Sequence, residues 1–351
     1  MGGSACLKAL FRADASVVLG SGHVMRCLAL ADALKVRGAK CFFICARAEG
    51  DLIDLIEVHG HAVFALRAPG DEVPGGDWTV DAELSQIYAR EVDPDWLVVD
   101  HYCLGVEWER SLRPSVGKIL AIDDIGRSHC CDMILDQNLD SSLHDHYRKP
   151  GDGDRVLMLG PTFALLRPEF AALRPRALAR RSGTLGRILV SMGGSDPQNE
   201  TSKALAGLAI ADCSDWIVDV VIGGKNPNAV AVTNACKQLP RAHIHLQTSK
   251  MAELMLSADC AIGAGGSTTW ERCCLGLPAI ATIVSDDQVA IVEAGAKAGA
   301  HIPLGRSSSI KPSDYANAIA ALTPDRLRAM SHAAARVCDG LGADRVAESM
   351  H

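Results

Sequence analysis

The sequence is poor in aromatic residues and contains no long apolar run. Phe, Trp and Tyr make up 4% of the 351 residues, which argues against a surface that stacks nucleic-acid bases. The 42 acidic residues outnumber the 35 basic ones, and the resulting net charge of −7 also disfavours a nucleic-acid partner. No apolar stretch approaches the roughly 20 residues of a membrane helix, and residues 1–14 lack the apolar core of a signal peptide. We therefore expect a cytoplasmic protein with no integral membrane segment.

The sequence also lacks the motifs of several common cofactor and metal sites. It has no CxxC pair, no HExxH and no GxxxxGK[ST], so we expect no metal, no cofactor and no P-loop chemistry. Its 13 cysteines are odd in number and follow no secretion signal, which indicates reduced thiols used for packing.

What the sequence does contain is an alternation of short apolar runs and longer helical stretches. Strands that are apolar throughout are typical of a parallel sheet covered by helices on both faces. At about 150 residues per domain, the length predicts two doubly wound α/β domains facing across a cleft. We place them at 1–160 and 161–351, near a Gly-rich loop at 149–154, with the last helix able to pack back on the first domain. We expect a monomer.

The first strand-to-helix junction is a candidate catalytic site. Its sequence, Gly20-Ser21-Gly22-His23, has Met25 where a dinucleotide fingerprint requires a third glycine, which disfavours NAD. A helix start of this kind suits a phosphate or a sugar oxygen. The helix dipole disfavours a protonated His23, so this side chain is a candidate general base. The alternative is a histidine that merely hydrogen-bonds a loop.

Carboxylates near this junction come from three strand ends. Asp14 follows the first strand and is expected to orient His23, to hold a sugar hydroxyl, or simply to cap a loop. Asp100 with Tyr102, and the pair Asp123-Asp124, stand at the ends of two later strands. In a parallel sheet these side chains face one crevice.

The second half repeats the strand–glycine–helix design twice. In Gly193-Gly194-Ser195-Asp196-Pro197, Asp196 is the expected N-cap and Pro197 the first helical residue, and the glycines let a ligand approach the backbone. In the stretch 265–271, Thr268 and Glu271 have the spacing of a capping box. The functional alternative places a diphosphate on the backbone amides of this turn and a ribose on Glu271.

Four segments together carry a family resemblance: Phe11–Leu34, Phe163–Phe170, Val190–Asn199 and Gly265–Pro278. They resemble the UDP-sugar hydrolases of pseudaminic acid biosynthesis. That family is similar to two-domain GT-B glycosyltransferases, especially the enzyme that adds GlcNAc to the lipid-linked peptidoglycan precursor. The resemblance implies hydrolysis of UDP-2,4-diacetamido-2,4,6-trideoxy-β-L-altropyranose at the sugar C1–O bond, with inversion and with His23 as the base.

The resemblance and the motifs together define a set of candidate residues. For the sugar these are Arg12, Asp14, Gly22, Asp100, Tyr102, Asn138 and Arg167, and for UDP they are Gly193, Gly194, Ser195, Gly266, Ser267, Thr268, Glu271 and Gln288. Because the chain is acidic, the anionic UDP is expected to be held by helix starts and by a residue such as Arg12 or Arg167.

Two positions depart from the family pattern. Phe163 replaces a frequent Tyr, and Asp287 stands where an amide is common; both put the identity of the sugar in doubt. Three alternatives remain open: a UDP-HexNAc-dependent GT-B glycosyltransferase, a non-catalytic sugar-nucleotide-binding protein and, more distantly, a 2-epimerase.

Overall fold

The chain folds into two compact units. The computed structural model describes residues 6–66, 77–139, 142–147 and 155–351. Unit 1 comprises Met1–Leu165 and Leu341–His351, and unit 2 comprises Leu166–Gly340. The Gly-rich stretch 149–154, where we expected a boundary loop, lies outside the described residues.

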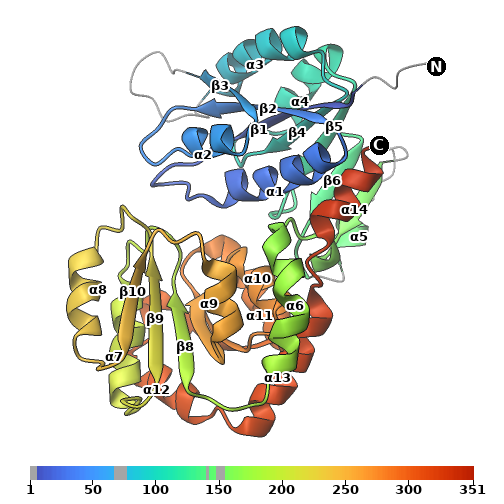
Figure 1. Cartoon of the computed structure of the whole chain (residues 1–351). Coiled ribbons are helices and arrows are strands. Elements are labelled where there is room, and N and C mark those ends of the chain that lie inside the picture. The colour runs from blue at the N-terminus through green and yellow to red at the C-terminus, as the bar shows by residue number, and fades with distance from the viewer. Residues whose placement is uncertain (1–5, 67–76, 140–141, 148–154) are drawn as a thin grey trace. The chain divides into compact units, whose positions relative to one another are not determined.

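Unit 1 is built on a seven-stranded sheet of strand order β3-β2-β1-β4-β5-β6-β7, in which every neighbouring pair is parallel (Figure 1). Its strands are β1 (Lys8–Ala13), β2 (Lys40–Ala46), β3 (Ala62–Leu66), β4 (Trp96–Asp100), β5 (Lys118–Ile122), β6 (Met133–Asp136) and β7 (Val156–Leu159). Its helices are α1 (Gly22–Val36), α2 (Ile53–Val58), α3 (Trp78–Val92), α4 (Val106–Leu112), α5 (Leu143–Tyr147) and α14 (Gly342–Ser349), with 3-10 turns at Arg113–Ser115 and Pro161–Phe163.

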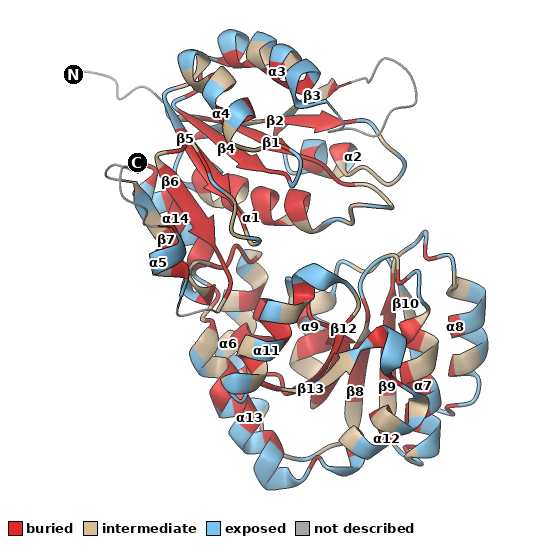
Figure 2. Cartoon of the chain, turned by 180° about the vertical axis from the view of Figure 1, so that it is seen from behind, coloured by how far each residue is buried: buried red, intermediate tan, exposed pale blue. Residues whose placement is uncertain are grey.

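The central strands of unit 1 are buried on both faces because their side chains alternate between two apolar layers. Ala9, Phe11 and Ala13 of β1 pack with α1, α2 and α14, whereas Leu10 packs with α3, α4 and α5. All five residues of β4 are buried (Figure 2). This burial explains the continuous apolar runs in the sequence.

The carboxyl-terminal segment belongs to the first core. Val346, Ala347 and Met350 are buried in the layer that α1 also covers, and the Trp96 indole Nε1–H donates to the Met350 carbonyl over 2.8 Å. Gly342 permits this return because its backbone lies against Phe163 and Ala164; a Cβ atom there would come within 2.3 Å of the Ala164 carbonyl oxygen.

Unit 2 is built on a six-stranded parallel sheet of order β10-β9-β8-β11-β12-β13. Its strands are β8 (Arg187–Ser191), β9 (Ile217–Ile222), β10 (Ala242–Leu246), β11 (Cys260–Ala264), β12 (Ala279–Ile283) and β13 (His301–Arg306). Its helices are α6 (Pro168–Arg180), α7 (Glu200–Ile210), α8 (Ala229–Cys236), α9 (Met251–Ser257), α10 (Thr268–Cys274), α11 (Val289–Lys297), α12 (Pro312–Ala320) and α13 (Pro324–Val337), with 3-10 turns at Asp286–Gln288 and Ser307–Ser309.

Both units are thus doubly wound, and the predicted fold class of two doubly wound α/β domains is confirmed. Ten of the 13 cysteines are buried, and all are free thiols. Among the described residues, no helix combines the length and the apolar character that crossing a membrane requires.

The close contact of Gly342 with the Ala164 backbone leads to a prediction about stability. We expect Gly342→Ala to lower the free energy of unfolding by about 1–3 kcal/mol, because the new methyl group overlaps the Ala164 backbone. Gly186→Ala is the matched control, since its Cβ atom would lie at an ordinary 3.9 Å from its nearest neighbour, a carboxylate oxygen of Asp259. Chemical denaturation of the three proteins measures the effect. Equal unfolding free energies for both variants would contradict the packing argument.

Candidate active site

The topology of unit 1 assembles the candidate site at one end of the sheet. β1 and β4 are neighbours, but the chain leaves β1 toward β2 and β3 and later fills the other side with β5, β6 and β7. Doubly wound sheets bind ligands at such a switch point, beyond the carboxyl ends of the strands. Ala13 pairs with Asp100 in the register of these two strands, so the start of α1 and the end of β4 meet there.

His23 and Asp100 form a hydrogen-bonded pair at this switch point. His23 is the second residue of α1, and its Nδ1 lies 2.6 Å from Oδ1 of Asp100. Burial works against ionisation of Asp100, yet Arg26 and His23 together hold its pKa well below the usual range. A carboxylate can only accept, so Nδ1–H of His23 is the donor, and in a neutral imidazole Nε2 then carries the lone pair.

Tyr102 completes the immediate surroundings of His23. The two rings meet edge to face, with centroids 4.6 Å apart and an interplanar angle of 85°, and Tyr102 is 37% exposed. Gly22 is the first residue of α1, directly before His23. The structure therefore brings together four of the predicted residues: Gly22, His23, Asp100 and Tyr102.

Asn138 is linked to this group through Asp124. Its side-chain amide donates to the backbone carbonyl of Asp124 over 2.8 Å, and the Asp124 carboxylate accepts from Arg26 over 2.9 Å. Arg26 is not among the residues predicted from the sequence. Its signal was present, since Arg26 follows His23 by three residues and therefore shares a helix face with it.

Arg12 and Asp14 have structural positions that correct the predictions made for them. The Arg12 side chain is fully buried and its guanidinium is taken up by Asp14, at 2.5 Å, and by Asp81, at 2.6 Å. It therefore has no surface to offer to a substrate. Asp14 is 2% exposed and also accepts from the Ala46 backbone N–H. The carboxylate that orients His23 is Asp100.

In unit 2 the same topology places two glycine turns at the switch between β8 and β11. Gly193 has a positive φ of 93°, which favours glycine there. A Cβ atom added to Gly193 or Gly194 would meet no atom of the described residues within 4 Å. Packing therefore does not require the second glycine, and Gly193, Gly194 and partly exposed Ser195 present accessible backbone.

The predicted N-cap at Asp196 is wrong, although Asp196 does cap the helix from a distance. α7 begins at Glu200, so Pro197 precedes the helix. Asp196 has a left-handed φ of 37° and its two oxygens accept from the N–H groups of Glu200 and Thr201 over 2.8 and 2.9 Å. Burial raises the pKa of this carboxyl.

In the second turn, Gly265 and Gly266 are under different packing constraints. A Cβ atom on Gly265 would come within 2.1 Å of Val292, whereas one on Gly266 would meet Gln288 at an ordinary 3.7 Å. Gln288 holds the turn, since its side-chain oxygen accepts from the N–H groups of Gly265 and Val284 over 3.1 and 3.2 Å. Gly265 is therefore required by packing, and Gly266 is not.

Ser267 and Thr268 begin α10, and the expected capping box is not the arrangement found. Ser267 occupies the N-cap position, and α10 starts at Thr268. Glu271 instead lies 3.5 Å from Arg167, and its side chain is 16% exposed. Burial raises the pKa of Glu271, and Arg167 opposes that shift. Arg167 also pairs with Glu169 over 3.1 Å.

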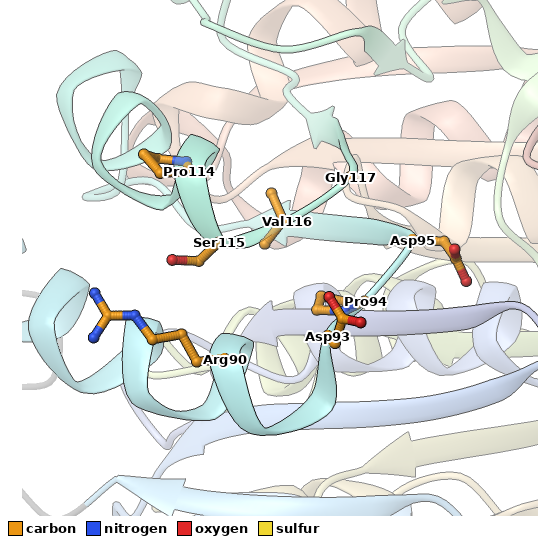
Figure 3. Close-up of a pocket in the computed structure, with 8 residues that line it drawn as sticks. All are labelled: Arg90, Asp93, Pro94, Asp95, Pro114, Ser115, Val116 and Gly117. Carbon is orange, nitrogen blue, oxygen red and sulfur yellow. The ribbon is translucent and has the colours of Figure 1, made fainter.

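The two positions that depart from the family pattern lie outside these contacts. Phe163 is partly buried against the apolar layer of α1 and α14, and Asp287 is exposed in the 3-10 turn before α11. A hollow of about 450 Å³ lies at the other end of the unit 1 sheet, before the amino ends of β4 and β5 (Figure 3). Its lining residues, Arg90, Asp93, Pro94, Asp95 and Pro114–Gly117, include none of the predicted site residues.

Comparisons with known proteins give partial sequence matches. A spore coat polysaccharide biosynthesis protein, SpsG of Bacillus subtilis, is 36% identical over 34% of this chain and 35% of its own. The UDP-2,4-diacetamido-2,4,6-trideoxy-β-L-altropyranose hydrolase of Campylobacter jejuni is 31% identical over 40% of this chain and 45% of its own. An uncharacterized protein of Methanocaldococcus jannaschii is 26% identical over 76% and 54%. The chain thus spans about half or less of these curated relatives, and no family model matches it.

Solved structures match over nearly the whole chain. MurG of Acinetobacter baumannii superposes with a TM-score of 0.71 at 14% identity, covering 98% of this chain and 99% of that one. The calicheamicin glycosyltransferase CalG4 gives 0.61 at 16% identity, over 99% and 98%. At these identities the likeness concerns the fold, and the predicted GT-B-like fold is confirmed.

The buried carboxyl of Asp136, close to Asn138, leads to a prediction about the pH dependence of stability. The Tyr147 hydroxyl lies 2.9 Å from Asp136 and 3.0 Å from Asp123, but its one hydrogen can be donated to only one carboxylate. Asp136 also accepts from the Asn138 N–H over 2.8 Å. Burial raises the pKa of Asp136 from 3.8 to about 6, so the native state holds a proton there that the unfolded chain releases.

We therefore expect the wild-type free energy of unfolding to fall, relative to that of Asp136→Asn, as the pH rises from about 4 through 6. The two-unit difference in pKa corresponds to about 3 kcal/mol once the acid is fully ionised. Denaturation curves of both proteins between pH 4 and 8 measure this difference. A difference that stays constant across the range would show that Asp136 is not the proton-holding group.

Proposed function

We propose that this protein hydrolyses a UDP-linked 2,4-diacetamido-2,4,6-trideoxy hexose to UDP and the free sugar. The observation that carries the proposal is the His23–Asp100 pair at the switch point of unit 1. A histidine whose Nδ1–H is bound to a carboxylate presents Nε2 as a base, in the arrangement that hydrolytic enzymes use to activate an oxygen nucleophile. The name of the Campylobacter jejuni relative supports the substrate class.

In the proposed reaction, His23 Nε2 takes a proton from water as the water oxygen attacks C1 of the sugar. The new C1–O bond forms opposite the departing group, so the configuration at C1 inverts. The bond from C1 to the diphosphate oxygen breaks, and its electron pair leaves with UDP. UDP is already a good leaving group, so the chain mainly has to place the water and stabilise the charge that develops.

We assign UDP binding to unit 2 on the basis of its open glycine turns. Backbone N–H groups at Gly194–Ser195 and Gly266–Thr268 are the proposed diphosphate donors, and Glu271 is the proposed ribose acceptor. Gly193, Ser267 and Gln288 shape these turns. Tyr102 and Asn138 are proposed to contact the sugar, and Arg167, beside Glu271, is proposed to contact the nucleotide sugar. We further propose that the enzyme acts in the cytoplasm as a monomer in pseudaminic acid biosynthesis.

A GT-B glycosyltransferase is the second candidate, because MurG and CalG4 match nearly the whole chain. In that case His23 would take the proton of an acceptor hydroxyl instead of that of water. The two candidates differ in whether UDP is released from the sugar nucleotide when no acceptor is present.

Turnover in ¹⁸O-labelled water tests the proposal directly. We expect UDP to form without an acceptor, the label to enter the sugar and the UDP to remain unlabelled, as mass spectrometry of both products would show. Label in the UDP would mean cleavage of the P–O bond and would overturn the mechanism. Turnover that needs an acceptor indicates the transferase, and UDP-sugar binding without turnover indicates a binding protein.

A histidine substitution tests the assigned base. We expect His23→Asn to lower kcat by about 10²–10⁴-fold, the usual contribution of a general base, while calorimetry shows UDP binding retained. His59→Asn is the matched control, because His59 lies at the surface of the same unit and pairs with Asp32. Near-normal turnover in His23→Asn would show that another group is the base.

A further inference from the structure

Arg26 shares the carboxylate that orients His23. It lies one helical turn beyond His23 on α1, is 8% exposed, and donates to both Asp100 oxygens, through Nε over 2.5 Å and Nη2 over 2.6 Å. The Oδ1 atom that takes the second of these bonds also accepts from His23 Nδ1. Nη1 of Arg26 donates to Asp124 over 2.9 Å, which anchors the far side of the guanidinium.

This geometry has two physical consequences for the imidazole. First, a guanidinium fork that binds both oxygens fixes the plane of the Asp100 carboxylate, and that plane sets the direction from which His23 Nδ1–H can donate. Second, Arg26 Nη2 lies 3.3 Å from His23 Nδ1, so its positive charge opposes a second proton on the ring. Asp100 alone would favour that second proton.

In the described part of the chain, the contacts of the His23 ring involve one cation, Arg26. His23 faces Asp100 from β4, the Tyr102 ring from the following loop and Arg26 from its own helix. The Cys27 Sγ atom lies 3.7 Å from Oδ2 of Asp100, and burial raises the pKa of the Cys27 thiol. The negative charge of Asp124 is paired with the Arg26 guanidinium.

We infer that Arg26 is a positioning residue, which keeps Asp100 on the Nδ1 side of His23 and keeps Nε2 free of a proton so that it can act as a base. The inference rests on the proposed role of His23, but the contacts that carry it are those of Arg26 with Asp100, Asp124 and the ring. The Arg26 guanidinium binds Asp100 and Asp124 and is not assigned a contact with a reacting atom. It acts through Asp100.

The test follows the His23 ring directly, by NMR of ¹⁵N-labelled protein, with His23→Asn used to assign its signals. We expect Arg26→Gln to move the titration midpoint of the ring upward by about one pH unit or more, because a neighbouring positive charge is lost. The acidic limb of the pH profile of kcat for UDP release should move upward by the same amount. At a pH below both midpoints, kcat of Arg26→Gln should therefore be about tenfold lower than that of the wild type.

Two further variants separate positioning from charge and from general destabilisation. Arg26→Lys keeps a positive charge but cannot fork across both oxygens, so we expect a smaller shift of midpoint together with ¹⁵N shifts of a mixed ring tautomer. Arg37→Gln is the matched control, because Arg37 lies just past the end of α1 and pairs with exposed Asp344. It should change neither the midpoint nor the tautomer.

The outcomes distinguish this inference from the proposed function. An Arg26→Gln midpoint equal to that of the wild type, or a wild-type tautomer in Arg26→Lys, would overturn the role of Arg26. If Arg26→Gln does not fold, the tautomer in Arg26→Lys decides. The midpoint in Arg26→Gln could instead shift while the rate profile stays unchanged, or while no hydrolysis is detected. Either result would support the positioning role of Arg26 and contradict His23 as the base for UDP-sugar hydrolysis.

Discussion

The parallel pairing of β1 with β4 is the constraint on which the candidate site of unit 1 depends. Because α1 follows β1 and Asp100 ends β4, this single pairing brings the start of the helix to the carboxylate. Unit 2 uses the same device, since β8 pairs with β11 and each is followed by a glycine turn. Each turn lies at a carboxyl end because the chain leaves a strand there, and parallel pairing places these ends on the same side of the sheet.

Once charged groups are gathered at such a point, burial determines how they must be arranged. An isolated buried ion costs several kcal/mol, so each arginine beneath the site is matched by two carboxylates. Arg12 is enclosed by Asp14 and Asp81, and Asp81 also accepts from the Trp108 indole N–H over 2.8 Å. That arginine is saturated. Arg26 differs, because one of its carboxylates is shared with a histidine.

The sharing of Asp100 gives the two arginine clusters different consequences. In the Arg12 cluster, the charges stabilise each other and hold β1 to α3, through Asp81. In the Arg26 cluster, the negative charge of Asp100 is divided between a permanent cation and a titratable ring. The orientation of the ring therefore depends on a carboxylate that Arg26 also holds.

Sequence patterns predicted the central parts of the fold because these strands are buried on both faces and read as continuous apolar runs. Sequence patterns indicate two of the four edge strands, β3 and β10, but not β7 and β13. β13 contains Pro303 and Gly305 and is only partly buried, and edge strands are where a sheet tolerates proline. β7, at the edge of the other sheet, has only four residues and is also only partly buried. Helix α6 was also missed; it contains Pro175, which is uncommon inside a helix.

Sequence reasoning selected His23 and Asp100 of the candidate site, but it did not show which side chains contact each other. His23 and Asp100 both follow from strand-end reasoning, yet 77 positions separate them, and only the strand order shows that they meet. Arg12 was misassigned because a lone arginine at a strand end does not reveal whether it is buried. Its partner Asp81 lies on a helix 69 residues away, and no local pattern connects the two.

The glycine turns of unit 2 show how packing can separate a structural glycine from one that is open to a ligand. Gly265 would clash with Val292 if it had a side chain, so its presence needs no ligand to explain it. Gly194 and Gly266 have room for a side chain, and packing gives no reason for their glycines. For a chain with a net charge of −7, open backbone N–H groups matter, because they can hold an anion without adding a positive charge. The acidic balance of the sequence and neutral-donor binding of a diphosphate are therefore compatible.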